Sequence, residues 1–308
     1  MRYGIPYKGS KNSIAEWVIA ELPRAETFVD LFMGGGAITH CAMLSGKYKN
    51  FIINDIDARM PQFFLDCIDG KYTTENHQEW ISREEFFARK DDDAYIALIW
   101  SFGNNGKDYI YSTEIEPFKR AYHQAVYKGD YGLFEQQGIN IPHTSEKSIY
   151  GRYRAIRGAL LKLFQSDLAR AENYERLQAA ENLQALQNLQ ALHVDYREVS
   201  IPDGALIYCD IPYGGTKCGK YDGFNHAEFY EWAKKQDNIY VSEYSMPAED
   251  FIQVARTTKR QLSSAKGSTD LVEERLYTNK KTYYKLSKER KRLAMLNMAE
   301  QTNIFDFL

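Results

Sequence analysis

Residues 27–36 read TFVDLFMGGG, an apolar run that carries one acid and passes into three glycines. The run over 27–32 predicts a buried strand, and we expect a helix from 37 to about 45. Residues 51–55, FIIND, predict a second strand that ends in an acid, with a helix over 59–68. A strand, a glycine turn, a helix and a strand in this order are typical of the start of a doubly wound α/β sheet.

The glycine turn and the second acid predict the kind of ligand. Glycines at the end of a strand let a ligand approach the main chain, and the helix that follows offers N–H groups to it. No GKS or GKT follows, so the phosphate loop of ATPases is absent. Asp55 comes about 20 residues later, where an acid accepts hydrogen bonds from ribose hydroxyls. These features predict an adenosine-containing cofactor and leave NAD and S-adenosylmethionine both open.

Regular α/β order returns after residue 194. Residues 205–210 and 238–242 predict strands, and 227–235 predicts a helix between them. We expect a turn or short helix at 247–254, and the last strands near 258–263 and 276–286.

The sheet is therefore split by an insert. Residues 1–72 and 195–308 are expected to form one α/β domain, and residues 73–194 an inserted domain that is rich in charge and in scattered tyrosines. Within the insert, 148–171 predicts a basic helix. Residues 175–192 repeat ERLQAA, ENLQAL and QNLQAL, which we interpret as a helix packed at the domain junction.

The composition is that of an ordinary globular protein, with 44% hydrophobic residues, 26% charged residues and a formal net charge of −3. A nucleic-acid site would have to be a local basic patch. The four cysteines have no metal-site spacing, and the chain has no apolar signal segment or membrane span. We expect a monomeric protein of the cytoplasm, with reduced thiols and no bound metal.

Residues 209–213, CDIPY, end the strand predicted over 205–210. An aspartate at this place in such a sheet points into the crevice above the strand ends. Proline fixes the turn and leaves main-chain carbonyls as acceptors. The tyrosine supplies a flat face for a base, worth roughly 1–3 kcal/mol. A carboxylate, a carbonyl and a stacking ring around one exocyclic amine predict a methyl-transfer site.

At CDIPY the chain resembles the Dam-type DNA adenine-N6 methyltransferases, whose catalytic motif is usually written DPPY. Ile211 replaces the first proline of that motif, which keeps the main-chain carbonyl but loosens the turn. The resemblance implies that Asp210 and the carbonyl of Ile211 hold the N6 amine. It also implies that Pro212 shapes the turn and that Tyr213 stacks on the flipped adenine.

The other motifs of the family occur in the same order. The cofactor motif is matched by Asp30, Phe32, Gly34 and Gly36, and the ribose-binding acid by Asp55. The N-terminal motif is matched by YKGSK at 7–11, so Tyr7 and Lys11, together with Asp210, are further cofactor-binding candidates. Residues 241–245, VSEYS, look like the later strand motif that helps to wall the base pocket.

The resemblance implies a Rossmann-like S-adenosylmethionine-dependent sheet with a mainly helical target-recognition insert. The expected reaction is direct methyl transfer to a flipped adenine at a specific site of double-stranded DNA. We expect the loop over 214–223 to close over that base. A GATC-like site and a bacterial or phage-infected cell are family-based expectations, and the sequence leaves open whether a restriction partner exists.

Two basic windows favour contacts with DNA phosphates. Residues 147–170 carry six basic residues against one acid, and 280–292 carry seven against one. The expected contacts are Asn104, Asn105, Lys107 and Tyr109 near a turn, and Arg152, Arg154 and Arg157 on the basic helix. The tail QTNIFDFL, 301–308, loosely resembles peptides that dock on replication sliding clamps.

Several alternatives remain at this stage. Cytosine-N4 enzymes usually carry serine in place of Asp210 and glutamine-amide enzymes carry asparagine, so the aspartate favours adenine. An RNA adenine methyltransferase stays open, as does a DNA-binding protein with a residual, inactive cofactor site. A nicotinamide oxidoreductase would leave CDIPY unexplained.

Overall fold

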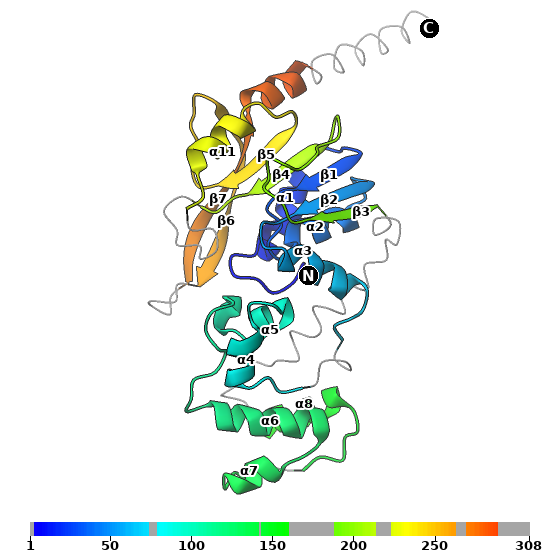
Figure 1. Ribbon diagram of the computed structural model, residues 1–308, viewed down its shortest axis with the longest axis vertical. Coiled ribbons are helices and arrows are strands. Elements are labelled where there is room, and N and C mark those ends of the chain that lie inside the picture. Colours follow the sequence, from blue (N-terminus) through cyan, green and yellow to red (C-terminus); the bar gives the residue numbers. More distant parts are fainter. Residues whose placement is uncertain are drawn as a thin grey trace, which may run out of the picture. The chain divides into compact units, whose positions relative to one another are not determined.

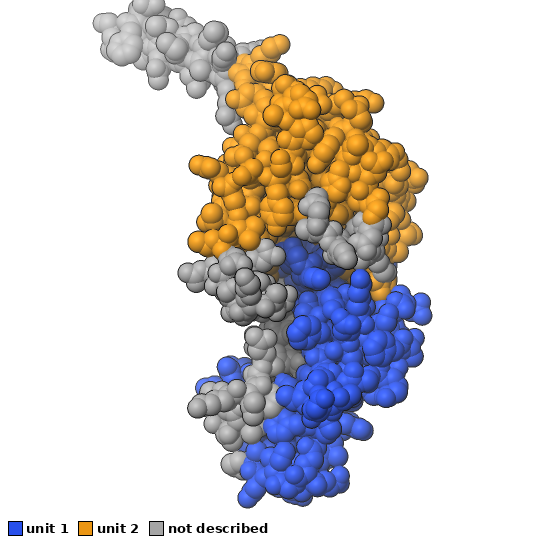
Figure 2. Space-filling model, turned by 90° about the vertical axis from the view of Figure 1, so that its left-hand side faces the viewer, with its two compact units in different colours: residues 1–10, 34–37, 62–181 blue, residues 11–33, 38–61, 182–308 orange. Residues whose placement is uncertain are grey.

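The computed structural model describes residues 3–73, 79–141, 143–159, 188–213, 223–262 and 269–288. Its contacts divide the chain into two compact units, coloured separately in Figure 2. The first unit contains 1–10, 34–37 and 62–181, and the second contains 11–33, 38–61 and 182–308. The far half of the basic helix, most of the leucine repeat, residues 214–222 of the expected closing loop and the tail 301–308 lie outside the described residues.

The second unit is built on a seven-stranded sheet with the order β3-β2-β1-β4-β5-β7-β6 (Figure 1). The strands from β3 to β5 pair in parallel, whereas β7 is antiparallel to β5 and to β6. Their bounds are β1 Thr27–Asp30, β2 Asn50–Asn54, β3 Leu189–Leu192, β4 Leu206–Asp210, β5 Ile239–Glu243, β6 Phe251–Leu262 and β7 Thr269–Asn279. The mixed sheet confirms the predicted α/β fold class.

Short helices accompany the strands of this sheet. They are η1 Asn12–Ile14, α1 Ala15–Glu21, α2 Ala37–Leu44 and α11 His226–Ala233. Helix α3 Arg59–Ile68 begins in the second unit, and its residues from Gln62 onward belong to the first. Asn225 caps α11, because its side-chain oxygen accepts a hydrogen bond from the main-chain N–H of Glu228 at 3.1 Å. Helices α2, α3 and α11 and strands β1, β2, β4 and β5 lie within about two residues of the elements predicted from the apolar pattern.

Strand β3 is the largest departure from the prediction, because the sequence indicated a helix over 175–192. Leu189–Leu192 instead pairs with Phe51–Asn54 as the edge strand of the sheet. The side chain of Asn54 secures the chain just beyond it, donating to the main-chain oxygen of Val194 at 3.0 Å and accepting from its N–H at 3.0 Å. Pairing with a distant strand thus overrides the local pattern.

Alternation along the strands divides the core into two faces. On one face, Val29, Ile207 and Val241 pack together with Phe229 and Ala233 of α11. On the other face, the ring of Phe28 packs against the rings of Tyr48, Phe51 and Tyr208 at centroid distances of 4.9 to 6.4 Å. Asp30 and Asp210 continue this second face to the carboxyl ends of their strands.

The β6–β7 hairpin extends beyond the rest of the sheet. Pairing between β5 and β7 ends at Glu243 and Arg275, whereas β6 and β7 remain paired out to Leu262 and Thr269. Figure 1 shows the two long strands running past the end of β5. The hairpin therefore places its distal half beyond the carboxyl edge, the edge at which ligands bind in such sheets.

Two predicted elements at this end of the chain were partly wrong. Residues 251–254 belong to β6 rather than to a turn or helix, and residues 280–288 are helical rather than a strand. Asn279 ends β7 because its side-chain oxygen accepts the main-chain N–H of Thr282 at 2.8 Å, as a helix cap does.

In its described residues, the first unit is helical apart from an isolated bridge between Ser101 and Tyr109. The helices are α4 Arg83–Arg89, α5 Ala94–Ile99, η2 Phe102–Asn104, α6 Glu116–Lys128, α7 Gly132–Gln136 and α8 Ile149–Ala159. Helices α6, α7 and α8 share a core that includes Ala125, Phe134 and Ile156. No helix in the described part of the chain is both long and apolar enough to cross a membrane.

Candidate active site

The centre of the candidate site is an ion pair on the catalytic motif. The Lys11 ammonium lies 2.8 Å from the Oδ1 atom of Asp210, at the end of β4. Only 5% of the Lys11 side chain is exposed, against 21% for Asp210. Burial alone would lower the pKa of Lys11, but the charges of Asp210 and Glu274 raise it above the usual value. Lys11 is therefore a fixed cation beside the motif.

Asp210 experiences two opposing influences. Burial raises the pKa of its carboxyl group, and the Lys11 ammonium opposes that rise. The neighbouring strand β5 places Ser242 opposite Asp210, and the Ser242 hydroxyl lies 2.8 Å from the hydroxyl of Tyr208. The Lys11 ammonium thus favours the ionised form of the Asp210 carboxyl group, against the effect of burial.

Tyr213 is held on several sides. Its hydroxyl donates to the Oε2 atom of Glu274 at 2.6 Å, and its ring meets the edge of Tyr244 with centroids 4.4 Å apart. The Lys11 ammonium lies over the ring face, 4.4 Å from the centroid. Burial and the carboxylates of Asp210 and Glu274 hold the pKa of Tyr213 far above its usual value. The phenol is therefore a neutral hydrogen-bond donor with a defined ring plane.

Glu274 and Lys259 complete this cluster, and the sequence prediction missed both. They form an ion pair across the β6–β7 hairpin, and Glu274 is 1% exposed. A weak signal existed, because Glu274 occupies a position between Val272 and Leu276 at which alternation predicts an apolar residue. An acid at such a position needs a partner in the core.

The turn of the motif is braced by a residue that the sequence prediction also missed. The Nε2 atom of His226 lies 2.7 Å from the main-chain oxygen of Pro212, and it donates when the ring carries its proton on Nε2. Ile211 is 2% exposed. The motif is thus anchored through the carbonyl of Pro212 and the side chain of Ile211.

Asp30 is a second buried acid on the face that Asp210 continues. Its Oδ2 atom accepts a hydrogen bond from the Thr39 hydroxyl at 2.7 Å. Burial raises the pKa of Asp30 to about 7, with contributions from the charges of Asp210 and Asp55, while the Thr39 hydrogen bond lowers it. A cation that binds beside this carboxyl group would lower its pKa and favour the ionised form.

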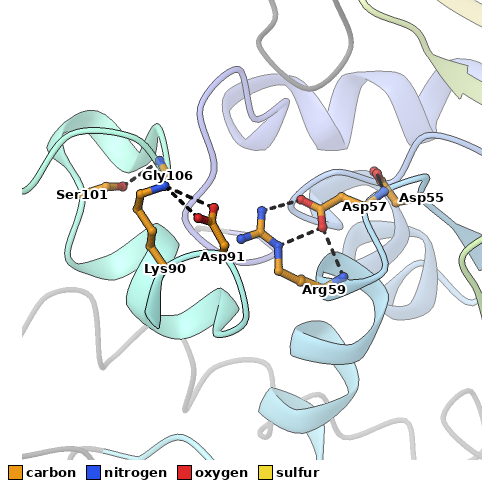
Figure 3. A network of polar contacts seen from close by, with 7 residues as sticks. All are labelled: Asp55, Asp57, Arg59, Lys90, Asp91, Ser101 and Gly106. Carbon is orange, nitrogen blue, oxygen red and sulfur yellow. Dashed lines mark hydrogen bonds and ion pairs between the residues drawn. The ribbon is translucent and has the colours of Figure 1, made fainter. Parts of the chain in front are cut away.

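Asp55, the predicted ribose-binding acid, lies directly after β2 and is 2% exposed. Its Oδ1 atom accepts the main-chain N–H of Asp57 at 2.9 Å. Asp57 in turn binds the guanidinium of Arg59 through both carboxylate oxygens, at 2.9 and 2.7 Å (Figure 3). The acid is thereby held in a fixed turn at the strand end.

Phe32, another predicted cofactor residue, packs against the aromatic core. Its ring centroid lies 5.4 Å from that of Tyr196 and 5.8 Å from that of Phe229. The ring is partly buried. Phe32 lies two residues after Asp30, the last residue of β1.

In the first unit, the N-terminal motif lies against the glycine turn. The main-chain N–H of Ile5 donates to the oxygen of Gly35 at 2.8 Å. Gly34 and Gly36 have positive φ angles of 47° and 64°, and a Cβ atom on Gly34 would lie 3.0 Å from the ring of Tyr7. A Cβ atom on Gly35 would lie 2.6 Å from the Cβ atom of Tyr7, so Tyr7 packs closely on Gly34 and Gly35 and leaves little room for larger residues at these two positions.

Polar groups of the predicted base-reading turn form hydrogen bonds within the turn and to the helix before it. Asn104 donates to the main-chain oxygen of Leu98 at 2.8 Å, and Asn105 donates to Asp108 at 2.8 Å. Figure 3 shows the turn closed by the Gly106 N–H, which donates to the Ser101 hydroxyl at 2.9 Å. The exposed side chains of this turn include Lys107 and, at 66% exposure, Phe102.

Tyr109 lies differently from the expected base reader. The side chain is buried, and its hydroxyl donates to the main-chain oxygen of Ile81 at 2.7 Å. The guanidinium carbon of Arg83 lies over its ring, 4.8 Å from the ring centroid. These contacts make Tyr109 part of the core of the first unit.

The three predicted arginines of α8 differ in their surroundings. Arg152 donates to the main-chain oxygens of Val126 and Tyr127 at 2.6 and 2.8 Å, where it satisfies the carboxyl end of α6. Arg154 and Arg157 are exposed on the same helix. Phosphate contacts are thus open to Arg154 and Arg157, while Arg152 has a structural position.

Comparison with protein families gives a clear result. The model of the D12 class N6 adenine-specific DNA methyltransferases matches residues 7–251. The chain belongs to this family. The match includes the glycine turn, Asp55 and the motif at 210–213, and it confirms the resemblance to DNA adenine-N6 methyltransferases. An adenine-N6 DNA methyltransferase requires a methyl donor and a DNA substrate.

Among solved structures, the chain is similar to the crystal structure of a protein described as an RNA methyltransferase from Pyrococcus horikoshii. The two share 10% sequence identity with a TM-score of 0.35, over 89% of this chain and 86% of the other. A likeness at that TM-score carries no argument about substrate. A comparison with curated proteins finds no match.

Proposed function

We propose that this adenine-N6 DNA methyltransferase uses S-adenosylmethionine to methylate an adenine that has left the helix, at a specific site of double-stranded DNA. The observation that carries the proposal is the cluster of Asp210, Lys11 and Tyr213 at the carboxyl end of β4. It combines an anionic acceptor with a stacking ring, the two groups that a planar base with an exocyclic amine requires.

The chain's own residues account for the handling of the amine. The Asp210 carboxylate accepts a hydrogen bond from N6–H, which draws electron density toward the nitrogen that forms the new bond. The main-chain carbonyl of Ile211 accepts the second N6–H. Extruding the base costs a few kcal/mol, and stacking on Tyr213 returns roughly 1–3 kcal/mol. The surplus proton of the methylated amine leaves to water.

The cofactor would be held by residues around the strand ends. S-adenosylmethionine, when bound, supplies an electrophilic methyl group on a sulfonium centre. In the second unit we propose Asp30, Phe32, Asp55, Lys11 and Asp210 as its binding residues. The state of Asp30 fits a cationic ligand, because a buried carboxyl with a pKa of about 7 gains a partner for its charge. In the first unit, Tyr7, Gly34 and Gly36 remain predictions from the resemblance.

DNA recognition is proposed for the inserted segment over 73–194. Its exposed basic side chains, Lys107, Arg154 and Arg157, suit phosphate contacts. Asn104 and Asn105 would read bases only by exchanging hydrogen bonds within the turn for hydrogen bonds to DNA. A GATC-like recognition sequence remains a family-based expectation.

The test is transfer of a labelled methyl group from S-adenosylmethionine to unmethylated DNA, followed by mapping of the modified base. Wild type should produce N6-methyladenine at one sequence. Asp210→Ala and Tyr213→Ala should both lose transfer, and in Tyr213→Ala cofactor binding, measured by calorimetry, should largely survive. Full activity of both variants, or labelling of a different base, would overturn the assignment.

A further inference from the structure

The Tyr213 ring is oriented by groups that come late in the chain. Its hydroxyl donates at 2.6 Å to Glu274 of β7, and Glu274 is paired with Lys259 of β6. We infer that Glu274, fixed by Lys259, is a positioning residue that sets the plane of the Tyr213 ring for base stacking. The inference rests on the proposed stacking role of Tyr213.

The geometry requires such a support. Tyr213 follows Pro212 and is the last residue of the motif, beyond the end of β4. A tyrosine side chain has two rotatable bonds, and a hydrogen bond from the hydroxyl restricts both, because it holds the far end of the ring and because a phenol O–H prefers to lie in the ring plane. Tyr244 packs against the ring, and Glu274 holds its far end.

The hairpin supplies that contact through its pairing. Glu274 stands opposite Thr257, and Lys259 stands opposite Val272 on the same hairpin face. Both residues lie beyond the last pairing between β5 and β7. The overhanging half of the hairpin is what brings a carboxylate to the ring.

The chemistry of the pair suits positioning rather than proton transfer. Glu274 is 1% exposed, so as a carboxylate it needs a cation, and Lys259 provides one. The neutral phenol then makes a charge-assisted hydrogen bond, about twice as strong as a bond between neutral groups. The acid contacts the tyrosine hydroxyl, so its effect on transfer passes through the ring.

A double-mutant cycle tests this inference on the full-length protein. Tyr213→Phe removes the hydroxyl and keeps the ring, and Glu274→Gln keeps the shape and removes the charge. Each change should lower kcat/KM for DNA about tenfold, from the strength of one charge-assisted hydrogen bond. Because both act through one contact, the double variant should also lose about tenfold rather than about a hundredfold.

Control variants separate positioning from stability. Glu273→Gln removes an acid on the opposite hairpin face, where Glu273 pairs with Arg256 and Arg275, and should keep kcat/KM within about twofold. Lys259→Met should reproduce the Glu274→Gln effect. The KM for S-adenosylmethionine of Tyr213→Phe should stay near wild type.

The outcomes are distinct. A wild type without methyl transfer would reject the proposed function itself. An active wild type with full activity in Tyr213→Phe and Glu274→Gln would overturn only the positioning role. Multiplying losses in the double variant would also overturn it, because they would show that Glu274 acts independently of the tyrosine hydroxyl.

Discussion

Lys11 offers a sharp test of the electrostatics at the catalytic motif. The Lys11 ammonium lies 2.8 Å from Asp210. The substitution Lys11→Met keeps a side chain of similar shape and removes the charge. An opposite charge at this range lowers the pKa of an acid by about 1–3 units. Asp210 is 21% exposed, so we take the lower part of that range, about 1–2 units.

The direction of the effect follows from which form is active. Asp210 must be ionised to accept the N6 hydrogen bond, and loss of the cation raises its pKa. The acid limb of kcat/KM, which reports the free enzyme, should therefore move to higher pH by about 1–2 units. At a fixed pH on that limb, the rate should fall about 10–100-fold. Activity should recover as the pH rises.

The assay is a pH–rate profile of methyl transfer to DNA, measured from about pH 5.5 to about pH 9.5. Lys11→Arg is the matched control, because it keeps a cation and should leave the limb within about half a unit of wild type. A Lys11→Met variant that loses the same factor at every pH would refute the reasoning. It would show that Lys11 acts by shape or by binding rather than through the charge of Asp210.

Two further predictions concern the cofactor residues and the glycine turn. Burial raises the pKa of Asp30 to about 7, so below that pH the binding of the cationic S-adenosylmethionine must displace a proton from Asp30. The affinity for S-adenosylmethionine should therefore rise about tenfold from about pH 6 to about pH 8 and then level off. Calorimetry should find this dependence abolished in Asp30→Asn, and an unchanged dependence would contradict it. Gly4→Ala should cost at least about 3 kcal/mol, because its Cβ atom would lie 2.3 Å from the oxygen of Gly35 at a φ of +67°. Gly9→Ala, with φ +85° and nothing within 4 Å, should cost about 1 kcal/mol in urea unfolding, and equal losses would refute the packing argument.

The parts of the fold predicted from sequence are those with strong local signals. Residues 27–36 and 206–213 combine apolar runs with glycine, proline and an acid at the turn, and such patterns fix where a strand ends. The family match then confirmed the class of reaction. Local patterning was sufficient because each of these signals lies within a single short segment of the chain.

The parts that were missed depend on distant pairing. Strand β3 is set by its pairing with Phe51–Asn54, more than a hundred residues earlier, whereas the repeat over 175–192 had been interpreted as a helix. Glu274 meets Tyr213 across 61 residues. Tyr109 was predicted to be a base reader from the residues near it in sequence, yet its hydroxyl donates a hydrogen bond to the main-chain oxygen of Ile81. Contacts of this range leave no period in the sequence.

The position of the β6–β7 hairpin bears on how the protein can be shortened. The family match ends at residue 251, where β6 begins, although β7 lies between β6 and β5 in the sheet. A recombinant chain cut at that boundary would retain every matched motif and lose two strands. Ile239–Glu243, buried along its whole length, would become an open sheet edge, which invites association between copies. Domain limits for expression should therefore follow the sheet and extend through Asn279.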